Sequence, residues 1–445
     1  MKNIRIIITV IAAIFVLFLP VHVYASDKVV VVIDPGHGGP DIESDAENGA
    51  MYNDNLSEKT VNLVTALAMK EELESYNNVE VYLTRDTDRS ISLEDRARYA
   101  KDLNADVMIC CHYNASETHL FYGAEIFTSA FSQCYATGNG LAQCILGKWE
   151  NDGAAIKGSK TRIGKTGKDY YGVIREGTRI GLPVIIIEHG YLDNHIDYAR
   201  LGMEEDWKRM GRLDAQGVAE YYGLSKDAVL SEVIPTVHVD IPEGTVEPDL
   251  SPPTSVDFEI VDYDPVNSEV VYQISAIEPD GSLMYYGLAL GEPDELEPSD
   301  YADLYLWTGE ANTVSGNLSV PSTYRGKISA RVYNSYELYS DCEPVMADMA
   351  TRVEEYEEEL RAIELEQAQE SLSKDSISLW VDNDTAIDTS EEEEEFTFFL
   401  GGRKADGKTK TGSAREKALL ILIISFVMVI LIIGILIYIV FFKRR

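Results

Sequence analysis

Short apolar runs that alternate with helical patterns constrain the fold of the first half of this chain more than any other feature. Such runs, bounded by turn-forming residues, are typical of buried strands, and helical segments between them favour parallel pairing. The pattern predicts an α/β domain over residues 28–224, with a mostly parallel twisted sheet flanked by helices. The runs are Val29–Ile33, Val79–Leu83, Asp106–Cys111, Ala124–Thr128 and Val184–Ile187.

Two of the intervening segments carry clear helix signals. Residues 58–76 place apolar side chains at helical spacing. Ser92 begins a Ser-Leu-Glu-Asp sequence that resembles a capping box, which predicts a helix through residues 96–103. Residues 132–178 are weakly patterned and rich in glycine and lysine, so we expect a helix and long surface loops there. Whether this segment covers a site as a regulatory lid stays open.

The character of the sequence changes after the α/β pattern ends. Residues 225–250 contain prolines and acids, which predicts a linker. In residues 251–346 apolar and polar residues alternate between turn sequences, the pattern of a small all-β sandwich. That region resembles a fibronectin type III or immunoglobulin-like module, and a spacer without a ligand is its simplest interpretation. Residues 350–402 are strongly acidic and predict a helical or disordered stalk.

Both ends of the chain carry long apolar stretches. Lys2 and Arg5 precede the first stretch, and Val23-Tyr24-Ala25 fits a cleavage site, so residues 1–25 are predicted to be a signal peptide. An uncleaved N-terminal anchor is the alternative. Residues 418–442 contain no charge and are long enough to cross a bilayer, which predicts a transmembrane helix. Together the ends predict a single-pass membrane protein with the intervening domains outside the cell.

The acidic balance of the chain excludes one class of partner. A formal net charge of −37 at pH 7 argues against nucleic acid as a partner, because phosphate binding requires a basic surface. The five cysteines are too sparse for a disulfide scaffold. Cys110 and Cys111 are expected to be buried core residues, whereas a Cys134–Cys144 bridge is an open alternative. Nothing in the sequence indicates an oligomeric state.

Polar residues follow three of the predicted strands at the point where each strand ends. His37 follows the first run within Asp-Pro-Gly-His-Gly-Gly, His112 follows the third, and Glu188 follows the last. Ligands bind at the carboxyl ends of strands in open α/β sheets, so we expect these side chains to converge at that edge. Glu58 opens the helix after the first strand and is expected near the same edge.

Two imidazoles and one carboxylate match the three protein ligands of a catalytic zinc site, which leaves the second carboxylate free to act as a base. Each residue also has an ordinary explanation as a turn residue, a strand-end residue or an acid at a helix N-terminus. The joint placement of His37, Glu58, His112 and Glu188 favours a site over these separate explanations. It does not name a substrate.

Several motifs occur in a fixed order along residues 28–223: VVVIDPGHGG, LSEKTVNL, VYLTRDTD, SLEDRARYAK, ADVMICCHYNAS, GAEIF and PVIIIEHGYLDN. They resemble the motifs of the zinc-dependent family 3 N-acetylmuramoyl-L-alanine amidases, which cleave bacterial peptidoglycan. The resemblance implies that His37, Glu58 and His112 bind Zn²⁺ and that Glu188 is catalytic. It implies hydrolysis of the amide bond between N-acetylmuramic acid and L-alanine by zinc-activated water, with Glu188 as the general base. With the predicted ends, it implies a bacterial membrane protein that faces the cell wall.

The match has one departure that bears on the metal ligands. The spacing from His37 to Glu58 is longer than the family leads us to expect, and Glu43 and Glu47 lie within it as rival ligands.

Three other residues of the motifs have roles that the resemblance does not fix. His189 is interpreted as a residue that orients Glu188, contacts substrate or has a structural role. Arg85 and Arg96 match positions that we interpret as structural ion-pair residues.

Two other functions stay open at this point. The chain could be a catalytically inactive surface protein that binds the cell wall. It could also be another zinc hydrolase that acts on the wall, such as a peptidase or a deacetylase. Identification of the product would distinguish these, since only an amidase frees intact stem peptides from glycan.

Overall fold

The computed structural model describes residues 28–39, 48–53, 56–301, 303–309 and 312–384 of the chain. The predicted signal peptide (1–25) and transmembrane helix (418–442) lie outside these ranges, as does the end of the predicted stalk. Within the ranges, no helix has the length and apolar character needed to cross a membrane. The chain divides into two compact units at Arg361, and the first contains both the α/β region and the β region.

A six-stranded sheet forms the centre of the α/β region. Its strands are β1 (Val29–Pro35), β4 (Val79–Leu83), β5 (Val107–Asn114), β6 (Ala124–Phe127), β7 (Ile156–Lys160) and β8 (Val184–Tyr191). They lie in the order β4-β1-β5-β8-β6-β7, and only the β6–β8 pair is antiparallel. The predicted mixed α/β class with a mostly parallel sheet is therefore confirmed.

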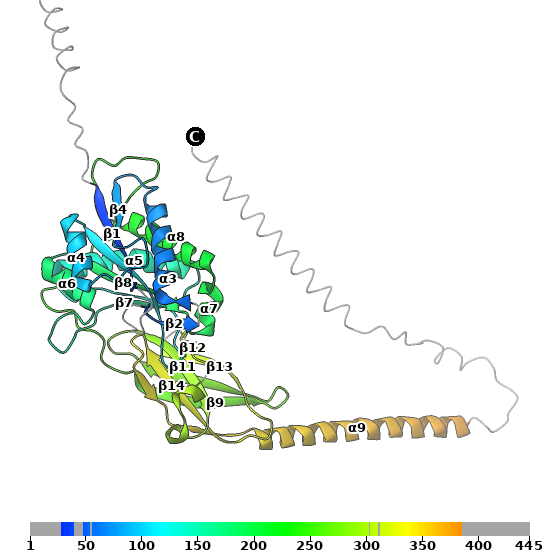
Figure 1. Ribbon diagram of the computed structural model, residues 1–445. Helices are drawn as coiled ribbons and strands as arrows, with labels where there is room; N and C mark the ends of the chain where they lie inside the picture. The colour runs from blue at the N-terminus through cyan, green and yellow to red at the C-terminus, as the bar shows by residue number, and fades with distance from the viewer. Residues whose placement is uncertain (1–27, 40–47, 54–55, 302, 310–311, 385–445) are drawn as a thin grey trace, which may run out of the picture. The chain divides into compact units, whose positions relative to one another are not determined.

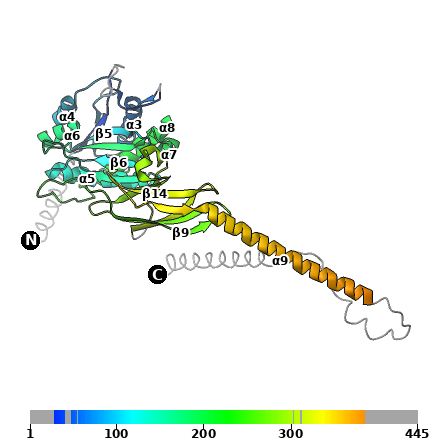
Figure 2. The same ribbon diagram turned by 90° about the horizontal axis from the view of Figure 1, so that it is seen from below.

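Helices cover both faces of this sheet, as Figures 1 and 2 show. One face packs against α3 (Glu58–Leu73), α5 (Ser132–Asn151) and α8 (Glu204–Tyr221), and the other against α4 (Leu93–Asp102) and α6 (Gly172–Ile180). The remaining elements of this region are β2 (Met51–Asn53), β3 (Leu56–Ser57) and α7 (His195–Leu201). Successive residues of a strand point to opposite faces. Cys111 accordingly packs under α3 and Cys110 under α4, and both are buried as expected.

The α/β region corrects the expectation for residues 132–178. The expected helix is present as α5, and it belongs to the core, because Leu141, Ile145 and Trp149 are completely buried. Strand β7 adds an edge to the sheet within the stretch that we expected to be loop. Its sequence, IKGSK, lacks the apolar alternation by which strands are recognised. The Cys134–Cys144 bridge is absent, since both cysteines are free.

The β region consists of two antiparallel sheets. One contains β9 (Thr254–Asp264), β10 (Glu269–Ile277) and β13 (Thr313–Ser319). The other contains β11 (Leu283–Leu290), β12 (Tyr305–Leu306), β14 (Arg325–Asn334), β15 (Tyr339–Asp341) and β16 (Val345–Asp348). Short 3₁₀ turns lie at Pro293–Glu295 and Pro298–Asp300, and helix α9 spans Met349–Asp384. Alternate residues of both sheets form one apolar core, as in a sandwich.

The predicted linker is packed against the α/β region rather than extended through solvent. The Val246 amide donates to the carbonyl of Ala130, and the Thr161 hydroxyl donates to the carbonyl of Val246. A buried apolar cluster then joins the two regions, with Leu120 and Tyr122 on one side and Met284, Tyr285, Leu304 and Tyr333 on the other.

Candidate active site

The turn after β1 carries His37 and is fixed by two arginines. Arg96 forms a buried ion pair with Asp34 at 2.7 Å and donates to the carbonyl of His37. Arg85 is 1% exposed and donates to the backbone carbonyls of Pro35 and Gly36. Arg96 therefore has the structural ion pair that was expected. Arg85 donates its hydrogen bonds to backbone carbonyls, so it stabilises the same turn in a different way.

His37, Glu58 and His112 come together at the carboxyl edge of the sheet. The Glu58 carboxylate lies 3.2 Å from Nε2 of His37 and 2.8 Å from Nδ1 of His112. Each of the three residues offers one ligand atom, and these three atoms lie within 4.8 Å of one another. His37 adopts φ 58°, a left-handed conformation that costs energy for a residue with a side chain and is common at functional sites.

Two glycines leave the room that this cluster needs. A Cβ at Gly36 would lie 2.3 Å from the His112 ring, and one at Gly49 would lie 2.4 Å from a Glu58 carboxylate oxygen. Gly49 also has φ +68°, which glycine adopts without strain. Both positions therefore require glycine if the three side chains are to meet.

The donor set of the cluster suits a divalent metal ion. Burial raises the pKa of Glu58, but hydrogen bonds from His112 and His37 outweigh it and hold that pKa well below its usual range. Burial lowers the pKa of His112, which favours the neutral ring that a metal requires. Two neutral imidazoles and an ionised carboxylate are a common three-residue ligand set of catalytic zinc sites. The rival residues Glu43 and Glu47 lie outside the described ranges.

Glu188 stands next to the cluster on β8. It pairs in register with His112 of β5, so the two side chains share one face of the sheet. Glu188 is 8% exposed, and its Oε2 makes no hydrogen bond within the described part of the chain. Burial, followed by the charges of Glu58 and Glu125, raises its pKa well above the usual range. A buried, unpaired carboxylate with a raised pKa has the properties of a proton acceptor and donor.

His189 points to the opposite face and is completely buried. Its Nδ1 bonds to the carbonyl oxygen of His112, and its Nε2 bonds to Asp214 of α8 at 2.8 Å. Trp149 donates a further hydrogen bond to the same carboxyl group. These bonds give His189 a structural role that ties β8 to β5 and α8, and its predicted contact with substrate stays a prediction.

A second buried charged group lies beside Glu188, and sequence reasoning missed it. Glu125 of β6 is the cross-strand partner of Glu188 and forms ion pairs with Lys160 and Lys157. Burial raises the pKa of Glu125, but the two lysines lower it to about 2. Burial lowers the pKa of Lys160 to about 8. The sequence carried two signals for this group. Glu125 lies within the motif GAEIF, and Lys157 and Lys160 lie in IKGSK, although lysines in such a run normally indicate an exposed strand.

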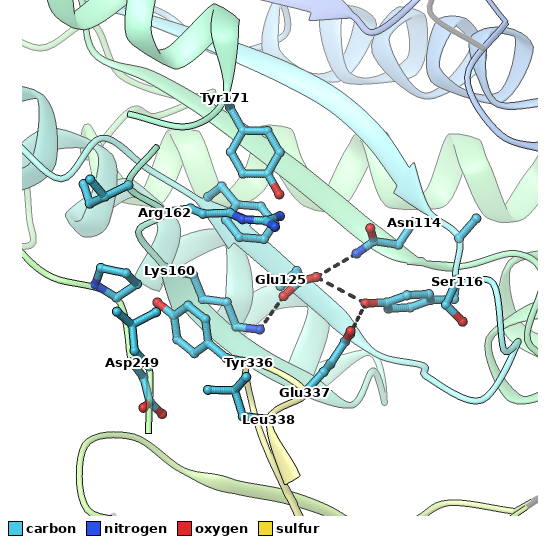
Figure 3. A pocket seen from close by; sticks show the side chains of 16 residues that line it. Asn114, Ser116, Glu125, Lys160, Arg162, Tyr171, Asp249, Tyr336, Glu337 and Leu338 are labelled. Atoms are coloured by element: carbon cyan, nitrogen blue, oxygen red, sulfur yellow. Dashed lines mark hydrogen bonds and ion pairs between the residues drawn. The ribbon is translucent and has the colours of Figure 1, made fainter. Parts of the chain in front are cut away.

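A cavity of about 380 Å³ opens next to Glu125, and Figure 3 shows the side chains around it. Asn114, two residues after His112 on β5, reaches the Glu125 carboxylate at 2.7 Å. The cavity therefore adjoins the strands that carry the candidate ligand and base. Its lining includes Glu125, Lys160, Arg162, Tyr171 and the β14–β15 turn of the β region.

Residues 31–220 match the family model described as N-acetylmuramoyl-L-alanine amidase. The chain is similar to the N-acetylmuramoyl-L-alanine amidase CwlM of Bacillus licheniformis, with 30% identity over 204 residues that cover 44% of this chain and 70% of that protein. It is similar to the sporulation-specific N-acetylmuramoyl-L-alanine amidase of Bacillus subtilis (strain 168), with 28% identity over 202 residues, or 44% and 69% of the two chains. Among solved structures, the catalytic domain of the amidase CwlV from Bacillus (Paenibacillus) polymyxa var. colistinus is 29% identical, with a TM-score of 0.37 and coverage of 44% of this chain and 100% of that one.

Proposed function

Because the chain belongs to the N-acetylmuramoyl-L-alanine amidase family, we propose that it hydrolyses peptidoglycan with Zn²⁺ held by His37, Glu58 and His112. The bond cleaved is the amide between N-acetylmuramic acid and L-alanine. Glu188 is the general base of this reaction. The observation that supports the proposal most is that Glu188 pairs in register with His112, which sets an unpaired carboxylate beside a complete ligand set.

The residues divide the chemistry between them. Zinc in such a site supplies Lewis acidity toward the scissile carbonyl and makes water a stronger nucleophile near neutral pH. Glu188 accepts the proton of the attacking water at its carboxylate. It then donates that proton to the amine nitrogen of L-alanine, which leaves as the carbon–nitrogen bond breaks. Burial disfavours the ionised form of Glu188 relative to the protonated form. This suits both the uptake of the proton from water and its later donation to the amine.

Product analysis tests this proposal against its alternatives. Purified peptidoglycan treated with the zinc-loaded full chain is expected to release new L-alanine amino termini and intact stem peptides. A peptidase would instead cut within the stem peptide, and a deacetylase would release acetate. An inactive wall-binding protein would sediment with the wall and release nothing. Any of these three outcomes would contradict the proposal.

The place of action is part of the same proposal. The basic N-terminal residues with their apolar stretch, and the uncharged residues 418–442, support export followed by retention in the cell membrane. The catalytic region then faces the cell wall, where its substrate lies. The acidic residues 350–402 act as a spacer between the membrane and that region.

A further inference from the structure

The cavity beside Glu125 has walls from both regions of the first unit. The turn after β14, residues 335–338, contributes Tyr336, Glu337 and Leu338 to its lining. This turn is fixed to the α/β region, since Lys160 donates to the carbonyl of Ser335 and the Tyr336 hydroxyl bonds to the backbone of Thr161. The β region therefore completes a cavity that the α/β region alone would leave open.

The acids that line this cavity already have partners. In each case a lysine or amide side chain of the protein donates to the carboxylate: the pairs are Glu125–Lys160, Glu337–Lys157 and Asp249–Asn334. These carboxylates are thus compensated within the protein. They do not call for a cationic ligand.

Arg162 is the exception among the charged residues of the lining. Its side chain is exposed, and no carboxylate of the described residues forms an ion pair with it. Its guanidinium carbon lies 4.1 Å from the centre of the Tyr170 ring, and the Tyr170 amide donates to the Arg162 carbonyl. The residue is therefore held on a closed hairpin with its charge unneutralised, and Figure 3 shows its side chain near Tyr171 and Glu125.

The cavity is lined by strand neighbours of the candidate catalytic residues. Glu125 lines it and is the direct cross-strand partner of Glu188 on the same face. Asn114 lines it from the strand that carries His112. A substrate whose scissile amide reaches Glu188 therefore has room to extend one side of its structure into this cavity.

We propose that this cavity is a subsite for the acidic stem peptide of the substrate, with the Arg162 guanidinium binding a peptide carboxylate. The subsite rests on the proposed amidase function, because it needs a substrate that carries a peptide beyond the cleaved amide. Arginine offers paired N–H donors that match a carboxylate. The turn 335–338 forms the facing wall, so the β region shapes the substrate site and is not only a spacer.

Two matched substrates test this proposal with the zinc-loaded, detergent-solubilised full chain. One is a soluble glycan fragment whose stem peptide has free carboxylates, and the other is the same fragment with those carboxylates converted to carboxamides. Arg162→Gln is expected to raise KM for the acidic substrate roughly 10- to 100-fold with little change in kcat, as for a lost charge-assisted hydrogen bond. Arg162→Gln is expected to leave KM and kcat for the amidated substrate unchanged. The KM of Arg162→Lys for the acidic substrate should lie between those of the wild type and Arg162→Gln.

The matched control is Lys165→Gln, which removes one positive charge from the same hairpin without touching the cavity lining. It is expected to behave as the wild type. Equal kinetics of Arg162→Gln and wild type on the acidic substrate would overturn the subsite, as would an equal loss on both substrates.

A binding measurement separates this inference from the proposed function. Calorimetric titration with the free acidic peptide is expected to show weaker binding to Arg162→Gln by the same factor. If the wild type binds that peptide through Arg162 yet cleaves neither fragment, the proposed function fails and the subsite stands. If it cleaves both fragments without any dependence on Arg162, the function stands and the subsite fails.

Discussion

Glu188 and Glu125 face each other across β8 and β6, and their pKa values are shifted in opposite directions. Burial raises the pKa of Glu188 well above the usual range, while Lys157 and Lys160 outweigh burial and lower the pKa of Glu125 to about 2. Neighbouring carboxylates with such different environments are assigned different roles. Glu125 is a permanent charge that organises the structure, whereas Glu188 is able to exchange a proton.

The acid side of the pH–rate profile is expected to reflect Glu188. A general base works only when ionised, so kcat/KM should fall as the pH drops through the raised pKa of this carboxyl group. The acid limb should therefore lie clearly above the pH at which an exposed glutamate titrates. Burial is the largest cause of the shift, and the charges of Glu58 and Glu125 add to it.

The same profile measured on Glu125→Gln gives a directional check. This substitution removes one of the negative charges that raise the pKa of Glu188, and the positive charges of Lys157 and Lys160 remain. The acid limb should move to lower pH. An unmoved limb, or one that already lies where an exposed glutamate titrates, would contradict the assignment of Glu188.

Zinc content is expected to depend on Glu58 and not on its sequence rivals. Glu58→Ala removes the carboxylate that lies within 3.2 Å of both histidine rings, so bound zinc should fall by at least about tenfold after dialysis. Glu43→Ala and Glu47→Ala serve as matched controls and should retain about one zinc ion per chain. Elemental analysis measures all three. If a control loses its zinc while Glu58→Ala retains it, the glutamate replaced in that control is the ligand and Glu58 is not.

Stability is expected to depend strongly on Glu125. Glu125→Gln leaves the ammonium groups of Lys157 and Lys160 buried with reduced compensation, which should lower the free energy of unfolding by about 3–5 kcal/mol. Urea unfolding of the wild type and the variant measures the difference. The exposed Glu117→Gln is the control and should change stability by less than about 0.5 kcal/mol. Equal stability of all three proteins would show that the buried charges are not coupled as described.

Deletion of residues 362–402 tests the proposed spacer. The deletion begins at Ala362, where the second compact unit starts, and it spares Val353, which packs on the core of the β sandwich. Cleavage of soluble wall fragments should be unchanged, and cleavage of the wall by membrane-bound enzyme in intact cells should fall. Replacement of the segment by an equally long flexible linker should restore cleavage of the wall in intact cells. Equal activity of the deleted and the full chain on intact cells would exclude a spacer role.

Much of the α/β fold could be predicted because its strands are buried. All five apolar runs are strands, and Ser92 caps α4 by accepting a hydrogen bond from the Asp95 amide. Strand β7 could not be predicted because its buried lysines, Lys157 and Lys160, are stabilised by partners far away in the sequence. Periodicity reports burial of apolar residues only, and it does not detect a strand whose interior is held by charge.

The candidate site was likewise predictable from the sequence only in part. Strand ends brought His37, His112 and Glu188 to one edge, and this could be anticipated from topology alone. The alternation of side chains also implied that His189 points away from Glu188, a consequence that the sequence interpretation left open. Arg162 carried no signal, since its importance depends on a cavity that is completed by a turn far along the chain.

The decisive experiment for Glu188 as the general base uses Glu188→Gln, with bound zinc and the release of L-alanine amino termini from purified peptidoglycan measured on the same preparation. Glutamine keeps the shape of the side chain but cannot accept the proton of water. We expect the variant to retain about one zinc ion per chain, while its hydrolysis rate falls at least about 100-fold. Full activity of this variant would contradict the role of Glu188, and loss of its zinc would show that Glu188 belongs to the ligand set instead.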